Sequence, residues 1–317
     1  MDAHVALVYS PEYLVRLWGL EKLHSFDVNK YEKIRRQLER DGLLGASDLH
    51  RPDEASREDI LLVHTEEYLE KLKSSHNVGW YLEAPFLAAL PGSVVDSRIL
   101  KPFRSASGGT ILAGRLALCH GIAVNIGGGY HHAKPDAGEG FNVYADIAVA
   151  IRRLQSEGLI RRSAVVDLDV HQGNGTATIF SGESGVFTFS MHEGNIFPVP
   201  KAKSDLDVEL AAATDDATYL GLLREHLPGV LDRARPDLVI FQAGCDTLAA
   251  DPLANLAMTK EGIVERDATV IDECVRREIP VAMTLGGGYA PDSWKVQYAS
   301  IRRTIETYGL ARQETPA

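Results

Sequence analysis

The second half of the sequence alternates short runs of β-branched and apolar residues with longer amphipathic segments. Strands are expected at residues 4–10, 121–129, 162–170, 185–191, 236–244 and 279–289. Helices are expected at residues 31–44, 61–75, 107–118, 144–158 and 259–278, the third of them after a Ser-Ala-Ser-Gly-Gly turn. This order predicts an α/β fold in three layers, with a central, mostly parallel sheet and helices on both faces.

The chain is long enough to bury a large core without disulfides, because it has 317 residues of which 45% are hydrophobic. It contains no internal repeat, low-complexity tract or flexible linker. Residues 1–317 are therefore expected to form a single domain, since large α/β sheets often reach this size.

Charge and cysteine usage narrow the function classes. The formal net charge of −11 argues against non-specific binding to nucleic acid or to anionic membranes. Cys119, Cys245 and Cys274 form no CxxC pair and suit a reducing compartment. The first residues do not resemble a signal peptide, and no apolar run reaches the ~18 residues of a membrane span. We expect a cytoplasmic protein, whose oligomeric state the sequence does not indicate.

Polar side chains gather where the predicted strands end. The segments are "GGGYHH" (127–132), "DLDVH" (167–171), "SMHE" (190–193), "GCD" (244–246) and "GGGY" (286–289). Open parallel sheets bind their ligands just beyond the carboxyl ends of the strands. The five segments are therefore expected to meet at one rim and to form a functional site.

The stretch "VVDLDVHQGNG" predicts a metal site. In a strand Asp167, Asp169 and His171 would share one face, because side chains alternate with period two. Asp169 and His171, joined by Asp246 from another strand end, offer two carboxylates and an imidazole, which suit one zinc ion in an open catalytic site. A binuclear site would need more acids, and residues 172–175 contain none. In the alternative interpretation these side chains only cap the following helix and bind loop amides.

Two further segments suggest proton transfer and oxyanion stabilisation. Imidazoles titrate near neutral pH, so His131 and His132 suit acid–base chemistry, and Asp167 is the natural partner of one of them. Tyr289 follows three glycines and could aim its hydroxyl at a carbonyl oxygen opposite the metal. The alternatives are loop hydrogen bonding for the histidines and simple packing for the tyrosine.

Taken together in order, these motifs resemble the zinc-dependent histone deacetylase superfamily, whose fold is arginase-like. The resemblance covers about residues 5–308 and includes "GGGYHHAKPDAGEGFNVYADIAVAI", "VVDLDVHQGNGT", "SMHEGNIFP", "AGCDTLAADPL" and "GGGY". The amino-terminal segments "VYSPEYLVRLWGLEKLHSFDVNKYEKI" and "DILLVHTEEYLEKL" are most similar to the class IV branch, typified by histone deacetylase eleven.

The resemblance assigns a role to each site residue. It implies that zinc is held by Asp169, His171 and Asp246, with His132 as the general base. It implies that His131, tied to Asp167, is the charged or proton-donating partner, and that Tyr289 polarises the acyl carbonyl. The lysine tunnel would be formed by Gly140, Phe141, Phe197 and Leu253. A monovalent cation, K⁺, would lie at Asp167, Asp169, His171, Ser190 and Met191.

One position departs from class I relatives. Where these carry a carboxylate beside the second active-site histidine, this chain has Asn174, which class II and IV members share. The resemblance therefore implies that His132 is less basic than in class I.

The expected function is removal of acyl groups from the ε-amino groups of lysine in proteins or peptides. Class IV membership implies long fatty acyl groups in preference to acetyl. An acetylpolyamine hydrolase stays open because Glu139 and Glu193 could act as acidic gatekeepers. A non-catalytic acyl-lysine binder is the third alternative. The sequence does not distinguish zinc from iron as the physiological metal.

Overall fold

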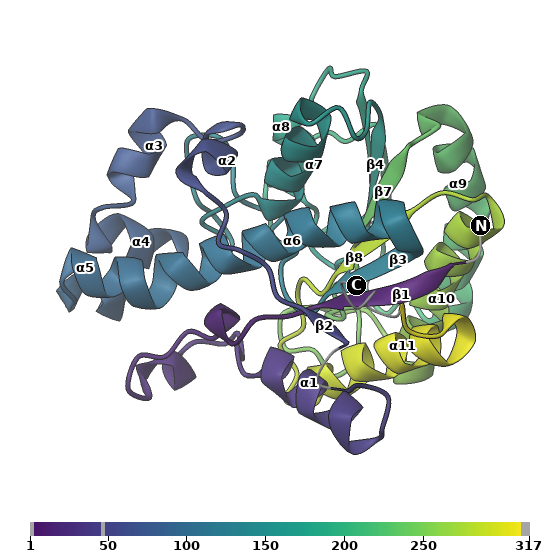
Figure 1. Ribbon diagram of the computed structural model, residues 1–317, viewed down its shortest axis with the longest axis horizontal. Helices are drawn as coiled ribbons and strands as arrows, with labels where there is room; N and C mark the ends of the chain where they lie inside the picture. Colours follow the sequence, from purple (N-terminus) through teal and green to yellow (C-terminus); the bar gives the residue numbers. More distant parts are fainter. Residues whose placement is uncertain (1–2, 46–47, 312–317) are drawn as a thin grey trace, which may run out of the picture.

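An eight-stranded parallel sheet forms the centre of the computed structural model, which describes residues 3–45 and 48–311 (Figure 1). The strands are β1 (His4–Val8), β2 (Leu49–His50), β3 (Gly121–Asn125), β4 (Ser163–Asp167), β5 (Val186–Glu193), β6 (Leu206–Leu210), β7 (Leu238–Gln242) and β8 (Val281–Thr284). Their order is β2-β1-β3-β8-β7-β4-β5-β6, and all neighbours pair in parallel. The predicted fold class is confirmed, whereas β2 and β6, at the two edges, lie outside the predicted strands.

Helices cover both faces of the sheet. The longer ones are α1 (Lys30–Arg40), α6 (Lys101–His120), α7 (Asp146–Ser156), α9 (Asp216–Ala234), α10 (Lys260–Arg276) and α11 (Ser293–Tyr308). In β1, Val5 and Leu7 belong to the core that α1, α9, α10 and α11 cover, whereas Ala6 and Val8 face the core of α6 and α7. This period-two alternation lets a strand that is apolar throughout serve two cores.

Shorter helices lie mostly at one end of α6, beyond the sheet (Figure 1). They are α2 (Arg57–Leu61), α3 (Glu66–Lys71), α4 (Ser75–Tyr81), α5 (Gly92–Val95), the 3₁₀ turns Pro11–Tyr13, Leu20–Leu23 and Pro85–Ala89, and a π-helical turn at Asp96–Leu100; α8 (Asn174–Ile179) follows β4. A third hydrophobic cluster, which includes Tyr68, Val78, Leu87 and Ile99, packs these elements against α6 and α7. Within the described residues no helix is long and apolar enough to cross a bilayer.

The prediction of a Ser-Ala-Ser-Gly-Gly turn before the third helix is wrong. Helix α6 begins at Lys101, so both glycines lie inside it. A Cβ atom on Gly108 would lie 1.9 Å from the carbonyl oxygen of Asp53, and one on Gly109 would lie 1.9 Å from the hydroxyl of Tyr13. These glycines serve close packing of the helix rather than a turn.

The helix predicted at residues 61–75 is interrupted. Helix α2 ends at Leu61 and α3 begins at Glu66, because the Thr65 side chain accepts a hydrogen bond from the backbone N–H of Tyr68 and caps a new helix. Helices α9 and α11 lie where none is predicted. Helix α9 contains Gly221, Pro228 and Gly229, residues that disfavour a helix and hide it in the sequence.

Candidate active site

The residues after β4 leave the strand earlier than predicted. Strand β4 ends at Asp167, so Asp169 and His171 lie in a loop and do not share a strand face with it. Two short turns aim them instead: the backbone N–H of Asp169 donates to Asp167 Oδ1 at 3.2 Å, and that of His171 donates to Asp169 Oδ1 at 3.0 Å. Aspartate side chains often fix loops in this way.

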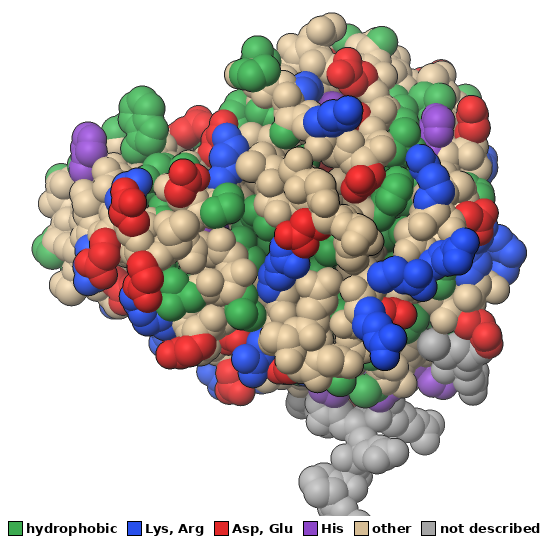
Figure 2. Space-filling view, turned by 90° about the horizontal axis from the view of Figure 1, so that it is seen from above, with side chains coloured by type: hydrophobic (Ala, Val, Ile, Leu, Met, Phe, Trp, Pro, Cys, Tyr) green, Lys and Arg blue, Asp and Glu red, His purple; other side chains and the backbone are tan. Residues whose placement is uncertain are grey.

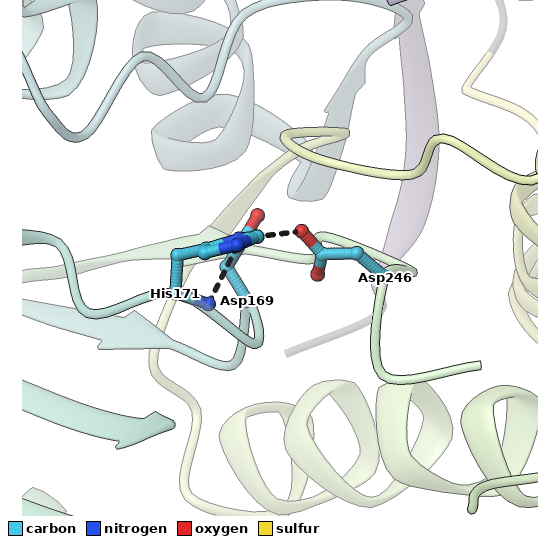
Figure 3. Close-up of side chains that lie close together, drawn as sticks. All are labelled: Asp169, His171 and Asp246. Atoms are coloured by element: carbon cyan, nitrogen blue, oxygen red, sulfur yellow. Dashed lines mark hydrogen bonds and ion pairs between the residues drawn. The ribbon is translucent and has the colours of Figure 1, made fainter. Parts of the chain in front are cut away.

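The loop brings Asp169, His171 and Asp246 together (Figure 3). His171 Nδ1 lies 3.4 Å from Asp169 Oδ1 and 3.2 Å from Asp246 Oδ2. In a tetrahedral zinc site with bonds of 2.0–2.2 Å, neighbouring ligand atoms lie about 3.3–3.6 Å apart. The two distances from His171 match this value, and all three donors lie within 4.8 Å of one another, so together they can hold one ion.

The electrostatics of the triad also favour a cation. Asp169 and Asp246 are almost completely buried. Burial, followed by the nearby carboxylate of Asp169, raises the pKa of Asp246 to about 7. Two buried carboxylates that repel one another become stable when a cation lies between them. The residues present therefore fit a metal ion.

Several partners fix the two carboxylates from behind. Asp169 Oδ2 accepts hydrogen bonds from Gln242 Nε2 and from the backbone N–H of Gly287, each at 2.9 Å. Asp246 Oδ1 accepts from the backbone N–H of Val170 at 2.9 Å. The glycine is required at 287, because a Cβ atom there would lie 2.2 Å from Asp246 Oδ2. Such contacts orient metal ligands and keep their lone pairs aimed at the ion.

Arg266 joins the loops that carry the triad. It projects from α10, is completely buried, and donates through Nη1 to the carbonyl oxygens of Leu168 at 3.0 Å and Gly244 at 2.8 Å. The prediction missed this residue. The sequence does indicate it: Arg266 lies three residues after Ile263 and four before Val270, a spacing that places this arginine on the apolar face of the helix.

The two adjacent histidines have different partners. His131 Nδ1 lies 2.7 Å from Asp167 Oδ2, the contact that the sequence predicts, and His132 Nδ1 lies 2.8 Å from Asn174 Oδ1. Both rings are buried, and His132 packs 6.1 Å from His171 between ring centroids. The Nδ1 atom of each histidine therefore has a hydrogen-bond partner.

The partners separate the pKa values of the two histidines. Burial lowers the pKa of His131, but the carboxylates of Asp167 and Asp169 outweigh it and raise that pKa to about 9. Burial and the positive charges of its neighbours His131 and His171 lower the pKa of His132 well below the usual range. At neutral pH the pair thus contains one charged and one neutral imidazole, the arrangement that acid–base catalysis uses.

Tyr289 lies beside His171 and Phe141. Its backbone N–H donates to Asp251 Oδ2 at 2.7 Å, and its ring is 6.3 Å from that of His171 and 5.9 Å from that of Phe141. Burial, followed by the carboxylate of Asp246, raises the pKa of its phenol well above the usual range. The hydroxyl therefore keeps its proton and can donate it in a hydrogen bond.

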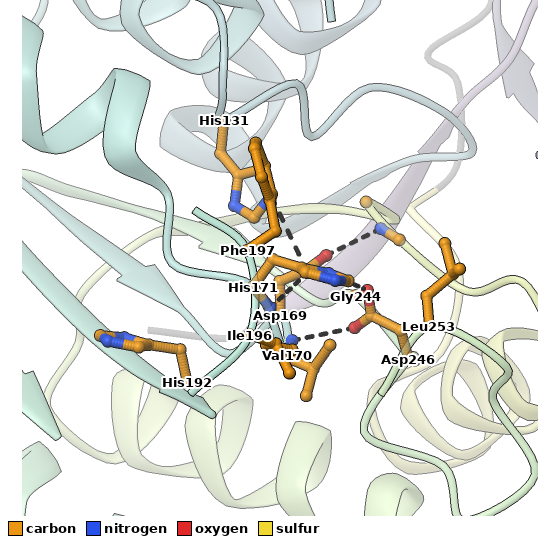
Figure 4. Close-up of polar contacts among 12 residues, drawn as sticks. His131, Asp169, Val170, His171, His192, Ile196, Phe197, Gly244, Asp246 and Leu253 are labelled. Atoms are coloured by element: carbon orange, nitrogen blue, oxygen red, sulfur yellow. Dashed lines mark hydrogen bonds and ion pairs between the residues drawn. The ribbon is translucent and has the colours of Figure 1, made fainter. Parts of the chain in front are cut away.

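The predicted tunnel residues lie near the triad and the histidine pair. The Phe197 ring lies 5.0 Å from His132, and a Cβ atom on Gly140 would lie 2.5 Å from the His132 ring. Phe141, at φ +64°, is held in a left-handed conformation that is rare for an aromatic residue. Leu253 comes from the loop after Asp246 and lies on that side of the triad (Figure 4). Phe197 and Leu253 are both 37% exposed, as expected at a mouth.

The segment "SMHE" differs from the other four polar strand ends, because Ser190 to Glu193 still belong to β5. Ser190 lies beside Asp167 in the sheet register, but its hydroxyl lies 2.9 Å from His192 Nδ1, and His192 points away from the triad (Figure 4). K⁺ at Asp167, Asp169, His171, Ser190 and Met191 stays a prediction.

An apolar cavity continues inward from the triad. It is partly open to solvent and reaches from His131, Asp169 and Tyr289 toward the amino-terminal segment and α6. Its inner wall consists of apolar side chains, among them Val15, Leu17, Phe26, Leu82, Ala84, Phe86, Leu87, Ile99 and Phe103. Its walls come from segments far apart in the chain, so the sequence does not indicate where this space lies.

Lys30 is the second residue that the prediction missed. It opens α1, is completely buried, and donates through Nζ to the carbonyl oxygens of Gly286 at 2.9 Å and Gly287 at 3.3 Å. It thereby fixes the turn that precedes Tyr289. No local signal separates it from the solvated lysines of the sequence.

The geometry agrees with what the chain is similar to. The Histone deacetylase domain family matches residues 24–305. Histone deacetylase 2 of Arabidopsis thaliana is 39% identical over 300 residues, which cover 94% of this chain and 78% of that protein. A histone deacetylase-like amidohydrolase of Pseudomonas aeruginosa is 28% identical, over 80% of this chain and 69% of its own length.

A solved structure shares the fold. The crystal structure of the HDA15 HD domain superposes with a TM-score of 0.75 at 20% identity and covers 96% of this chain and 90% of its own. This likeness supports the arginase/deacetylase arrangement of the sheet and helices. With the family match over most of its length, the chain belongs to the histone deacetylase family.

Proposed function

We propose that this protein is a zinc-dependent hydrolase that removes acyl groups from the ε-amino groups of lysine in proteins or peptides. One observation carries the proposal: Asp169, His171 and Asp246 bring three donors within reach of one ion, beside one charged and one neutral histidine. Zinc held there would polarise a carbonyl oxygen and lower the pKa of water to about 7.

Each side chain has a task in this reaction. His132, which is neutral, accepts the proton of the attacking water, and Asn174 keeps its Nδ1 occupied. His131, which Asp167 holds in the charged form, supplies a proton to the departing amine. Tyr289 donates a hydrogen bond to the oxygen that becomes negative in the transition state.

The acyl group that fits best is a long one. The apolar cavity beyond the triad offers walls for an alkyl chain, and each methylene buried there contributes about 0.8 kcal/mol. Gly140 also lines this cavity, and a Cβ atom on it would lie 2.5 Å from the His132 ring. A fatty-acyl preference is also what assignment to class IV implies. The amino-terminal segments and Asn174 support that assignment.

The acetylpolyamine alternative has less support. Glu193 is buried and binds both the backbone N–H and the side chain of Asn255, each at 2.9 Å. Glu139 pairs with Lys134 at 2.5 Å. Both acids are therefore engaged within the protein rather than directed at a polyamine. Charges of both signs are interspersed on the face that Figure 2 shows, without one large acidic patch.

A panel of substrates tests the proposal. Lysine peptides of one sequence would carry acetyl, butyryl, octanoyl or myristoyl groups, and acetylpolyamines would be included. We expect kcat/KM to rise with chain length. A maximum at acetyl would leave an ordinary deacetylase, and preferential turnover of acetylpolyamines would favour the small-molecule hydrolase. Binding without turnover of any substrate by the zinc-loaded protein would support the non-catalytic binder.

A further inference from the structure

A tight turn places Glu139 next to the histidine pair. The backbone groups of Glu139 and Asn142 bond each other in both directions, at 3.0 and 2.9 Å. Gly140 and Phe141 between them have φ values of +54° and +64°, as a type I′ turn requires. The Asn142 side chain accepts a hydrogen bond from the backbone N–H of His132 at 2.8 Å. The turn and the histidine are therefore fixed relative to one another.

The side chain of Asn174 connects Glu139 to His132. Its Nδ2 atom donates to Glu139 Oε2 at 3.1 Å, and its Oδ1 atom lies 2.8 Å from His132 Nδ1. A carboxylate can only accept hydrogen bonds, so the amide nitrogen must face Glu139 and the amide oxygen must face the ring. The oxygen in turn requires a proton on His132 Nδ1. His132 Nε2 is thereby left free to accept one.

Without the carboxylate, nothing in this contact would distinguish the two ends of the amide. The terminal torsion of asparagine is broad and roughly two-fold, so the group could turn over. Its NH₂ would then face an unprotonated Nδ1, and the imidazole proton would occupy Nε2, where a general base must be free.

We propose that Glu139 is a positioning residue that acts through Asn174 to hold His132 in the tautomer with Nε2 unprotonated. This inference rests on the proposed hydrolysis, in which His132 is the base. In this chain the pair of Asn174 and Glu139 takes the place of a single carboxylate beside the histidine. Asn174 thus lies between the Glu139 carboxylate and the His132 ring, and the ring remains neutral.

Lys134 provides a matched control. Its Nζ atom contacts the same oxygen, Glu139 Oε2, at 2.5 Å, and the two side chains are 33% and 32% exposed. Exposed ion pairs of this kind contribute little to stability. Lys134→Gln removes the ion pair but keeps the acceptor for Asn174, whereas Glu139→Ala removes both. Glu139→Gln keeps an oxygen that can accept from both donors.

Steady-state kinetics give the first test. We expect Glu139→Ala to lower kcat roughly tenfold with little change in KM, because about 1.4 kcal/mol, close to the lower end of the range for a hydrogen bond to a charged group, corresponds to a factor of ten. Glu139→Gln and Lys134→Gln should stay within about threefold of the wild type. Equal losses in Lys134→Gln and Glu139→Ala would mean that the ion pair only stabilises the turn, and would overturn the proposal.

A double-mutant cycle sharpens the test. In an Asn174→Asp background the introduced carboxylate accepts from His132 Nδ1 in either orientation, so Glu139 is no longer needed and repels it instead. Glu139→Ala should then leave kcat unchanged or raise it. The same roughly tenfold loss in both backgrounds would contradict an action through Asn174.

The tautomer itself can be measured without turnover. ¹⁵N NMR of histidine-labelled, zinc-loaded protein, with His132 assigned by substitution, should detect Nδ1–H in the wild type and a mixture of tautomers in Glu139→Ala. Nε2–H in the wild type would overturn the inference. If the tautomer changes as expected but neither protein hydrolyses any acyl-lysine, the proposed function fails while the positioning contact stands.

Discussion

The ammonium group of Lys30 lies 2.9 Å from the carbonyl oxygen of Gly286, so the first residue of α1 binds the turn that ends at Tyr289. The lysine is completely buried, and its ammonium nitrogen lies over the Phe26 ring, 4.3 Å from the centroid. Burial lowers the pKa of Lys30, and the carboxylates of Asp246 and Asp169 act against this. A charge held in the core in this way fixes the position of its partners.

Lys30→Met should destabilise the protein and impair catalysis together. The change leaves the carbonyl oxygen of Gly286 without this donor, whereas that of Gly287 still accepts from the backbone N–H of Cys245 at 3.1 Å, and a buried unsatisfied group costs about 1–3 kcal/mol. The free energy of unfolding of the metal-free protein, measured by urea denaturation, should fall by that amount. kcat should fall because the turn before Tyr289 loosens. Full stability and activity in this variant would show that the glycine turn holds itself.

The metal ligands can be tested by elemental analysis. Asp246→Ala removes a charged donor whose Oδ2 atom lies 3.2 Å from His171 Nδ1, and we expect zinc and activity to be lost together. Asp251→Asn is the control, because Asp251 is also buried near the site but binds the backbone of Tyr289 and Ala290 instead. It should retain zinc. Full zinc in Asp246→Ala would remove Asp246 from the ligand set.

The alternation of strand and helix made the fold predictable, because a strand buried on both faces must be apolar throughout. The exact placement of the site was less predictable. Asp169 and His171 meet through turns at the end of β4 and not through strand geometry. The choice of residues was still informative, since any ion between buried carboxylates needs such donors.

Other elements were hidden because long-range contacts decide them. The local sequence around Gly108 and Gly109 is typical of a turn, yet both lie in α6, where Asp53 and Tyr13 pack against them. In the sequence Lys30 resembles a solvent-exposed lysine, yet the carbonyl oxygens that it binds lie 256 and 257 residues away in the chain. A sequence pattern records local preferences, so contacts across such distances leave no signal in it.

The pH dependence of hydrolysis should reveal the charged histidine. The pKa of His131 is raised to about 9, so His131 is protonated below that value and loses its proton as the pH rises through it. We expect kcat/KM to fall on the alkaline side, at or somewhat below about pH 9, since a bound cation lowers this pKa.

Asp167→Asn removes the carboxylate that lies 2.7 Å from His131 and holds its charge. The alkaline limb should then move to lower pH by about 1 unit or more. The profile would be recorded with zinc content checked at each pH. An alkaline limb at the same pH in both proteins would assign it to another group.

Tyr289→Phe removes one hydroxyl and almost no volume. If that hydroxyl binds the developing oxyanion, kcat should fall by roughly 10²–10³, the usual loss for one such donor. KM, zinc content and the thermal midpoint should change little, because the backbone contact to Asp251 does not involve the hydroxyl. An unchanged kcat would reduce Tyr289 to a packing role against Phe141.

The apolar cavity can be narrowed without touching the triad. Ala84 lines it from the segment before the turn Pro85–Ala89 and is buried. Ala84→Leu would place three more carbons in the cavity, and it should lower kcat/KM for myristoyl-lysine at least tenfold while leaving acetyl-lysine nearly unchanged.

The acetyl substrate thus serves as an internal control. Ala212→Leu, the same substitution at an exposed position, serves as a second control. Overpacking costs about 1–3 kcal/mol where no space exists, so a large drop in thermal midpoint would mean that the leucine does not enter the cavity. Equal losses for acetyl and myristoyl would show that the chain of a long acyl group does not pass Ala84. A selective loss would place it between the triad and α6.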